Sequence, residues 1–121
     1  MSTTEPKLVR ISTGPLANPK PAAPKRPISG DAKFNGMKVF EGRGGKVRAG
    51  VWESTSGVFQ ADTTGYIEYG HIVEGDCRIV DPDGTVHTLN VGDPFIMPEG
   101  YKGRWEIDSF VKKVYMVAET A

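Results

Sequence analysis

The stretch that decides the fold runs from Glu68 to Trp105 and reads EYGHIVEGDCRIVDPDGTVHTLNVGDPFIMPEGYKGRW. Short apolar runs alternate in it with turn residues at Gly75, Asp81–Gly84 and Pro98–Gly100. Glycine supplies the positive φ that many turns need, and proline ends a strand because it cannot donate to the hydrogen-bond ladder. The stretch therefore predicts short strands joined by tight turns, with a hairpin at Asp81–Gly84.

The same rhythm of strands and turns continues on both sides of this stretch. No segment keeps a period of 3.6 residues, so we expect almost no helix. Eight or nine short strands with frequent turns are typical of an all-β sandwich or barrel. The predicted strands are Met37–Phe40, Val47–Glu53, Val58–Asp62, Tyr66–Glu74, Cys77–Asp81, Thr85–Leu89, Phe95–Met97, Arg104–Ile107 and Val111–Ala118.

Composition narrows the classes of function. The 121 residues hold 15 basic and 15 acidic side chains, so no positive surplus exists to neutralise phosphates, and we expect no nucleic-acid partner. No long apolar run predicts a membrane-spanning helix, and the first residues lack the apolar core of a signal peptide. The one cysteine, Cys77, cannot form an internal disulfide, which fits a cytoplasmic location.

Residues 1–30 differ from the rest of the chain. Six of the nine prolines lie here, so this segment cannot be a regular strand or helix throughout. We expect an extended N-terminal arm, followed by a barrel over residues 31–121. The arm either lies on the surface of its own barrel or reaches over a partner subunit, where Leu8–Ile11 could add an edge strand.

The turn residues also carry a resemblance to a known family. Glu68 and Gly75 fit the E-x6-G part of the first cupin motif, and Gly92, Pro98 and Gly100 fit the G-x5-P-x-G part of the second. The resemblance spans roughly residues 46–118 and implies a double-stranded β-helix, the jelly-roll barrel of cupins.

Within the cupins, the chain looks most similar to the small members grouped with ureidoglycine aminohydrolase and the ethanolamine-utilisation cupins. That similarity implies, for function, a small-molecule pocket inside the barrel. The residues that carry it are Val51–Glu53, Ser56–Phe59, Ile72–Gly75, Asp83–Gly84, Gly92–Asp93, Pro98–Gly100, Trp105 and Val111–Tyr115.

The same resemblance places the family's metal positions on residues that include no histidine. They fall at Asp62, Thr64 and Glu68, with the downstream position at Gly103. Two carboxylates hold a hard cation weakly, whereas a tight site normally needs three or four protein ligands. We therefore predict no metal and no other cofactor, and leave open a weak cation at Asp62 and Glu68.

Glu68 is the first candidate for a chemical role. Its cupin match implies that it points into the barrel, and the family carries the Lys-x-Tyr of Lys113 and Tyr115 into the same space. A buried Glu–Lys pair beside a tyrosine is a usable catalytic set, but Glu68 and Lys113 could equally be a structural ion pair. Both alternatives stay open on the sequence alone.

Two tryptophans are candidates for the wall of the pocket. Trp105 lies two residues past Gly103 on the same strand face, so we expect it to line the cavity, with room beside the glycine. Trp52 lies on a strand of similar alternation and either joins the wall or packs in the core. Aromatic walls serve a core, a flat ligand or a cationic one. Asp62 completes the predicted pocket.

The remaining reactive side chains are given plainer roles. If Glu68 faces inward, strand alternation turns His71 outward, together with Ile67, Tyr69 and Val73. This outward row is too apolar to face water comfortably, so we expect a homodimer or cover by the arm. His87 is expected on a solvent-facing strand. Cys77 is expected to be a buried, inert thiol.

These observations lead to one function and two alternatives. The chain is expected to be a small-molecule-binding cupin with a degenerate metal site. As an enzyme it would act in nitrogen or amine catabolism and would use Glu68, Lys113 and Tyr115. The first alternative is a non-catalytic metabolite-binding or sensor cupin. The second is a metal-dependent hydrolase that uses Asp62 and Glu68.

Overall fold

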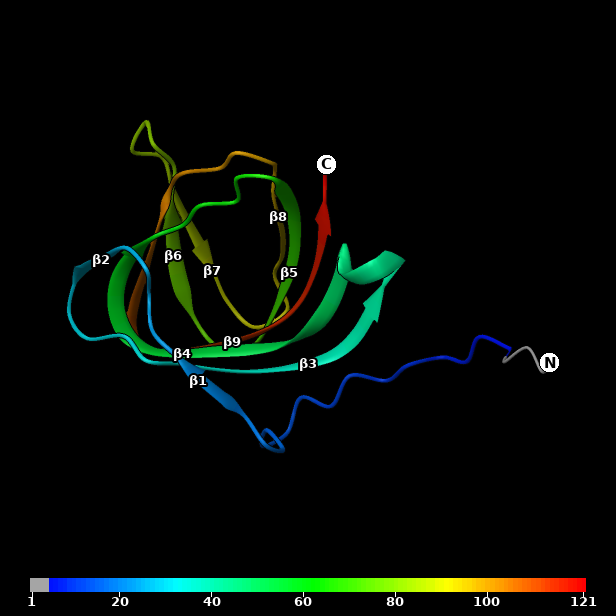
Figure 1. Cartoon of the computed structure of the whole chain (residues 1–121). Coiled ribbons are helices and arrows are strands. Elements are labelled where there is room, and N and C mark those ends of the chain that lie inside the picture. The colour runs from blue at the N-terminus through cyan, green and yellow to red at the C-terminus, as the bar shows by residue number, and fades with distance from the viewer. Residues whose placement is uncertain (1–4) are drawn as a thin grey trace.

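The computed structural model describes residues 5–121 and consists of strands wrapped around a central space (Figure 1). Apart from one short 3₁₀ turn at Arg43–Gly45, the regular elements of the described residues are all strands, which confirms the all-β prediction. The strands are β1 (Lys20–Ala22), β2 (Pro27–Ser29), β3 (Phe34–Gly42), β4 (Val47–Gln60), β5 (Tyr66–Gly75), β6 (Cys77–Val80), β7 (Val86–Leu89), β8 (Pro94–Met97) and β9 (Arg104–Glu119).

The two longest strands, β4 and β9, pair along their whole length and belong to both walls of the barrel. The half of the pair in which Gly50 opposes Tyr115 belongs to the first wall, which has the strand order β1-β3-β4-β9-β5-β8. The half in which Phe59 opposes Trp105 belongs to the second wall. There β2 pairs with β4, β6 pairs with β9, and β7 pairs with β6. The result is a jelly roll in which β7, paired only with β6, and β8, paired only with β5, are edge strands of the two walls.

The predicted breaks inside β4 and β9 were wrong. Ser54–Gly57 resembles a turn in the sequence, yet β4 continues through it with a register shift between Thr55 and Gly57. The bend needs glycine at position 57 because Ala32 packs directly against it. A Cβ at Gly57 would lie 2.6 Å from the Ala32 Cβ. A bulge, unlike a turn, bends the strand without ending its pairing.

The proline-rich arm contributes two strands that the sequence did not predict. β1 pairs with β3 and β2 pairs with β4, both antiparallel. Proline is tolerated at such edges because a missing donor there leaves no partner unpaired. The division of the chain at residue 30 remains a prediction about domains, but residues 20–29 already form part of the sheet.

The first part of the arm, from residue 5, runs below and to the right of β3 in Figure 1. Val9 and Ile11 line a cavity together with Phe40 and Met116 on the outer face of the sheet. The Lys112 ammonium donates hydrogen bonds to the backbone oxygens of Thr13 and Gly14, at 3.2 and 3.0 Å. Within the single chain, the arm therefore packs on its own barrel. Contact with a partner subunit stays a prediction.

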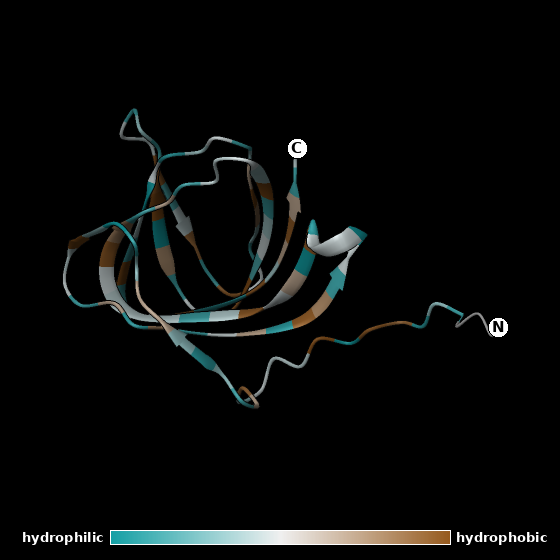
Figure 2. Ribbon diagram, in the orientation of Figure 1, coloured by the Kyte–Doolittle hydropathy of each residue, from teal (hydrophilic) through white to brown (hydrophobic). Residues whose placement is uncertain are grey.

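The core lies between the two walls, where apolar residues alternate with polar ones along the strands (Figure 2). Alternation on β5 follows the prediction: Glu68 and Ile72 are buried, while Ile67 and Tyr69 are 42% and 44% exposed. The buried apolar residues of the core cluster are Ala32, Phe59, Ala61, Ile72, Cys77, Ile79, Met97, Trp105, Ile107 and Val111.

One apolar row crosses the outer face of the sheet. Pairing registers place Phe40, Ala49, Met116, Tyr69 and Ile96 side by side on five successive strands. Four of the five are at least 40% exposed, and Ala49 is buried. We call these five residues the outer row.

Among the described residues, no helix has the length and apolar character needed to cross a membrane.

Candidate functional site

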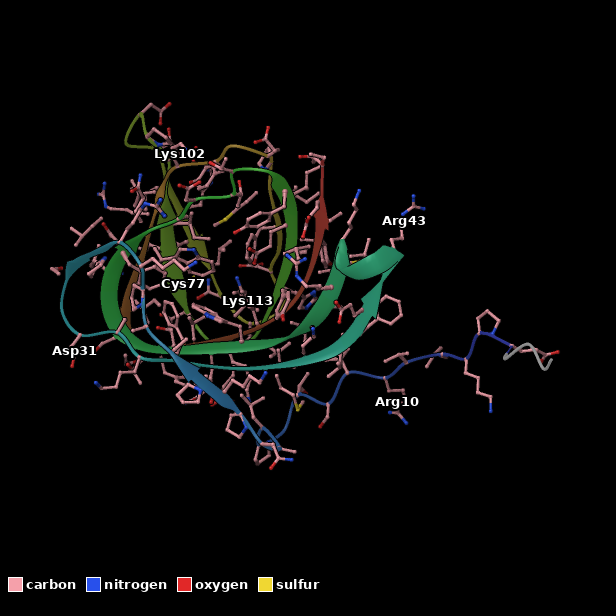
Figure 3. All side chains as sticks on the ribbon, in the orientation of Figure 1. Arg10, Asp31, Arg43, Cys77, Lys102 and Lys113 are labelled. Carbon is pink, nitrogen blue, oxygen red and sulfur yellow. The ribbon has the colours of Figure 1, made fainter. Side chains whose placement is uncertain are left out.

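A buried ion pair lies at the centre of the barrel. Glu68 on β5 and Lys113 on β9 both point inward, and only 9% and 7% of their surface is exposed. The Lys113 ammonium donates to Oε2 of Glu68. Figure 3 shows Lys113 among the side chains that fill the space inside the strands. The pairing is the one that the sequence suggested, while the catalytic roles of both residues stay a prediction.

Aromatic rings surround the ammonium of Lys113. Its Nζ lies 4.6 Å from the ring centroid of Trp52 and 4.7 Å from that of Trp105. The ring faces of tryptophan carry negative charge and attract a cation at such distances. Phe34 and Phe59 pack behind the two tryptophans, with ring centroids 4.9 Å apart. The cage therefore compensates part of the desolvation cost of the buried lysine.

The pair forms part of the wall of a cavity of about 450 Å³. Trp52, Trp105 and Asp62, the three predicted pocket residues, all line it. Residues 22–26 of the arm line one side, so the arm closes a site that the barrel alone would leave open. The volume lies within the range of small-ligand sites, roughly 300–1,000 Å³.

Tyr115 lies in a second cavity, of about 360 Å³, on the other side of the pair. Glu68, Lys113 and Trp52 line both cavities, whereas Tyr115 lines only this one, together with Met37 and Lys38 from β3. Burial, followed by the negative charge of Glu68, raises the pKa of Tyr115. Tyr115 thus keeps its proton at neutral pH and can donate a hydrogen bond, but it does not share a cavity with Trp105 and Asp62.

Asp62 stands at the rim of the first cavity and is held in a polar network. One of its carboxylate oxygens accepts hydrogen bonds from the Thr64 hydroxyl, the Thr64 amide and the Lys102 ammonium. The other lies 3.4 Å from Arg26. The Thr64 side chain, then its amide, then Lys102 hold the pKa of Asp62 well below its usual range. Asp62 is therefore a carboxylate whose oxygens already have partners.

The residues at the family's metal positions do not fit a metal centre. Glu68 is occupied by Lys113 and Asp62 by its own network, and the Thr64 hydroxyl donates to Asp62. No group of three or more potential ligands from His, Cys, Asp and Glu occurs among residues 5–121. With at most two oxygen donors, both engaged, no step of the chemistry can be derived through a bound metal.

The space beside Gly103 is occupied, contrary to our expectation. A Cβ at this position would collide with the Tyr101 hydroxyl and with the backbone oxygen of Val80. Glycine is therefore required at 103 because the Tyr101 ring lies against it. A histidine at 103 would have to displace that ring.

The other reactive side chains fall close to their predicted places. His71 lies on the outer face of β5, half-buried, and Cys77 is buried, where desolvation raises the pKa of its thiol to about 12. His87 is exposed, as expected, but it does more than face solvent. Its Nε2 lies 2.9 Å from Asp81, and its ring lines a cavity between the two walls.

Sequence reasoning missed two contributors to the site. Residues 22–26 were assigned to an arm outside the barrel, and Phe34 and Phe59 were not recognised as members of the cage. Strand alternation could have found Phe59, which opposes Trp105 across β4 and β9. Nothing in the local sequence of residues 22–26 marks them as cavity residues, because only the turn back onto β4 brings them there.

Comparison with known proteins identifies the family. The model of the EutQ-like cupin domain matches residues 41–115, well over half of the chain. The chain belongs to this cupin family. No curated protein sequence matches it significantly.

Solved structures support the same fold. A protein of unknown function from Pseudomonas syringae pv. tomato superposes with a TM-score of 0.76 at 25% identity, over 89% of this chain and 46% of that one. The chain therefore spans just under half the length of this relative. EutQ from Clostridium difficile gives a TM-score of 0.63 at 17% identity, over 73% of this chain and 69% of that one. Ectoine synthase from P. lautus gives 0.65 at 14%, over 78% and 70%.

Proposed function

We propose that the cavity lined by Glu68, Lys113, Trp52 and Trp105 binds a small polar or nitrogen-bearing metabolite. The observation that supports this proposal is the buried ion pair on the cavity wall. Taking two charges out of water is costly, and hydrophobic residues of similar volume are often at least as stabilising. Ionisable groups retained in a cleft are typical of functional sites.

The pair favours a ligand that both accepts and donates hydrogen bonds. Lys113 offers N–H donors, and the carboxylate of Glu68 offers acceptor oxygens beside them. An amide or ureido group presents a carbonyl oxygen and N–H groups at a similar spacing, and its flat face suits the tryptophans. The similarity to ureidoglycine aminohydrolase, which rests on the residues of this sequence alone, points to the same class.

As an enzyme, the site would divide the work among three side chains. Glu68, as general base, would accept a proton from a water molecule that attacks the carbonyl carbon, and Lys113 would stabilise the negative charge that develops on the carbonyl oxygen. The C–N bond would then break, and the amine would leave as ammonia with the proton returned by Glu68. Tyr115, protonated on the far side of the pair, would orient Glu68. We place this chemistry in the cytoplasm, where a free thiol such as Cys77 stays reduced.

The alternative of a non-catalytic binding cupin uses the same cavity without turnover. The alternative of a hydrolase with a metal at Asp62 and Glu68 is supported less, because Lys102 and Lys113 already neutralise those carboxylates. Elemental analysis of the dialysed protein tests it. One tightly bound transition metal per chain would revive this alternative.

Calorimetric titration with ureidoacetate, glycinamide and ethanolamine tests the proposal, with ammonia release measured in parallel. We expect saturable binding of the ureido compound to the wild type and a loss of at least tenfold in the double variant Glu68→Gln/Lys113→Met. Thr88→Val, on an outer strand face, is the matched control. Binding with ammonia release supports the enzyme, and binding alone supports the sensor. Equal affinity of wild type and double variant would contradict the proposal.

A further inference from the structure

The two walls of the barrel leave an opening between their free edges, β7 and β8. β7 pairs only with β6, and β8 pairs only with β5, so the edges face each other without pairing (Figure 1). A cavity of about 230 Å³ fills this opening. We call it the seam cavity. Its apolar lining consists of Ile79, Leu89, Pro94, Phe95, Ile96 and Met97.

A polar network stands at one end of the seam cavity. The Tyr101 hydroxyl donates to Oδ1 of Asp81 at 2.7 Å, and His87 Nε2 lies 2.9 Å from Oδ2 of the same carboxylate. Side-chain hydrogen bonds from His87 and then Tyr101 hold the pKa of Asp81 below its usual value, so Asp81 is ionised. A carboxylate only accepts, and therefore Nε2 of His87 carries the hydrogen.

This arrangement leaves the other ring nitrogen of His87 for a ligand. In the neutral form of the ring, a hydrogen on Nε2 leaves a lone pair on Nδ1 that accepts a hydrogen bond. No hydrogen bond to Nδ1 occurs within residues 5–121. Asp81 and Tyr101 thus fix the tautomer of a histidine that borders an apolar cavity, and an apolar cavity with a few convergent polar groups is the usual form of a small-molecule site.

The charges around the seam cavity select among ligands. Its lining contains no lysine or arginine, while Asp81 lies within it and Asp83 follows in the adjoining hairpin. An anionic head group would meet these carboxylates without a compensating cation. A cationic head group would find both oxygens of Asp81 already engaged by Tyr101 and His87.

From this geometry we propose a second binding site, in the seam cavity, for a neutral molecule the size of a single ring that carries one hydroxyl donor. The ring packs against Leu89, Phe95 and Met97, and the hydroxyl donates to Nδ1 of His87. The site is independent of the function proposed for the interior cavity, because Glu68 and Lys113 do not line it. Met97 lines both cavities, and the Phe95 ring lies 5.8 Å from Trp105, so the two sites share a wall.

Amide chemical shifts of the full chain test the site with three probes of matched size: phenol, benzoate and benzylamine. We expect phenol to shift the amides of His87, Leu89, Ile96 and Met97 saturably, with a Kd on the order of a millimolar for so few atoms. Benzoate and benzylamine should bind at least tenfold more weakly. Absence of saturable shifts at these amides, or a charged probe that binds as well as phenol, would overturn the proposal.

Three variants complete the test. His87→Phe keeps a ring but removes the acceptor, and should weaken phenol binding at least fivefold. Leu89→Trp fills the cavity and should abolish binding of all three probes. Thr88→Phe places the same ring on the opposite face of the same strand and should leave phenol binding unchanged. If His87→Phe loses its dispersed amide spectrum, His87→Gln, which retains an acceptor oxygen, must still bind phenol. Unchanged phenol affinity in a folded His87→Phe or Leu89→Trp variant would contradict the assignment.

Discussion

Lys112 and Lys113 are neighbours on β9, and both are buried, at 4% and 7% exposed, yet they are stabilised by different means. Lys113 points into the barrel and meets a carboxylate and two tryptophan faces. Lys112 points outward and meets two backbone oxygens of the arm, with Glu53 and Glu74 near the edge of ion-pair range, at 3.8 and 3.9 Å.

The difference shows which face of the strand depends on which part of the chain. The inner lysine is enclosed by the barrel and would be left buried without a counter-charge if its partner were lost. The outer lysine is hydrogen-bonded to the backbone of residues 13 and 14, and we expect its ammonium to return to water if they moved away. Desolvated charges without partners are far more costly than solvated ones. The three predictions below test this contrast.

The largest effect is expected from the inner pair. Glu68→Gln leaves the ammonium of Lys113 buried without a counter-charge, and should lower the free energy of unfolding by about 3–5 kcal/mol. Adding Lys113→Met removes the stranded charge and should restore most of that loss. Urea unfolding followed by circular dichroism measures both variants.

Glu106→Gln is the control for this prediction. Glu106 pairs with Arg78 and Arg104 nearer the surface, and such pairs contribute about 0–1 kcal/mol. If Glu68→Gln were no more destabilising than Glu106→Gln, the inner pair would not carry the stability that its burial implies.

The sequence was sufficient for the fold and for the inward direction of the central pair. Turn residues and strand alternation are local signals, and they predicted an all-β sandwich or barrel. The resemblance to cupins implied the inward direction of Glu68 and Lys113. The surroundings of Gly103 could not be predicted locally, because the space beside it depends on the position of Tyr101. The Tyr101 hydroxyl donates a hydrogen bond to Asp81, and the backbone amide of Tyr101 donates one to the Thr63 hydroxyl. The two strands of the arm could not be predicted for the same reason. Proline content shows that a segment is irregular, but it does not show which sheet edge the segment pairs with.

A second effect concerns the outer row on the same face as Lys112. We propose that a second copy of the chain covers this row, because four of its five side chains are large, apolar and at least 40% exposed in the single chain. Tyr69→Lys places a charge within the row, between Met116 and Ile96. Burying one such side chain contributes about 1.5–3 kcal/mol, so association should weaken at least tenfold.

Sedimentation velocity over a micromolar concentration series measures this association. Thr88→Lys adds the same charge on exposed β7, away from the outer row, and should leave association unchanged. A wild type that sediments as a monomer throughout the series would show that the outer row has no second copy as its partner.

The smallest effect is expected at the outer lysine. Lys112→Met removes two hydrogen bonds from a charged donor and leaves two arm carbonyls without a partner, which should cost about 1–2 kcal/mol. Deletion of residues 1–14 should cost no more, because the uncovered ammonium is solvated instead of stranded. The two changes act on one contact, so their effects should not add. A double-mutant cycle of unfolding free energies therefore has a definite expectation: in the truncated chain, Lys112→Met should be nearly neutral.

Lys33→Met is the control. The Lys33 ammonium is exposed and pairs with Asp31, so this change should show the same small effect in both backgrounds. Full additivity of Lys112→Met and the deletion would mean that the arm does not hold Lys112 in solution, and the outer lysine would then owe its burial to β9 and its neighbours alone.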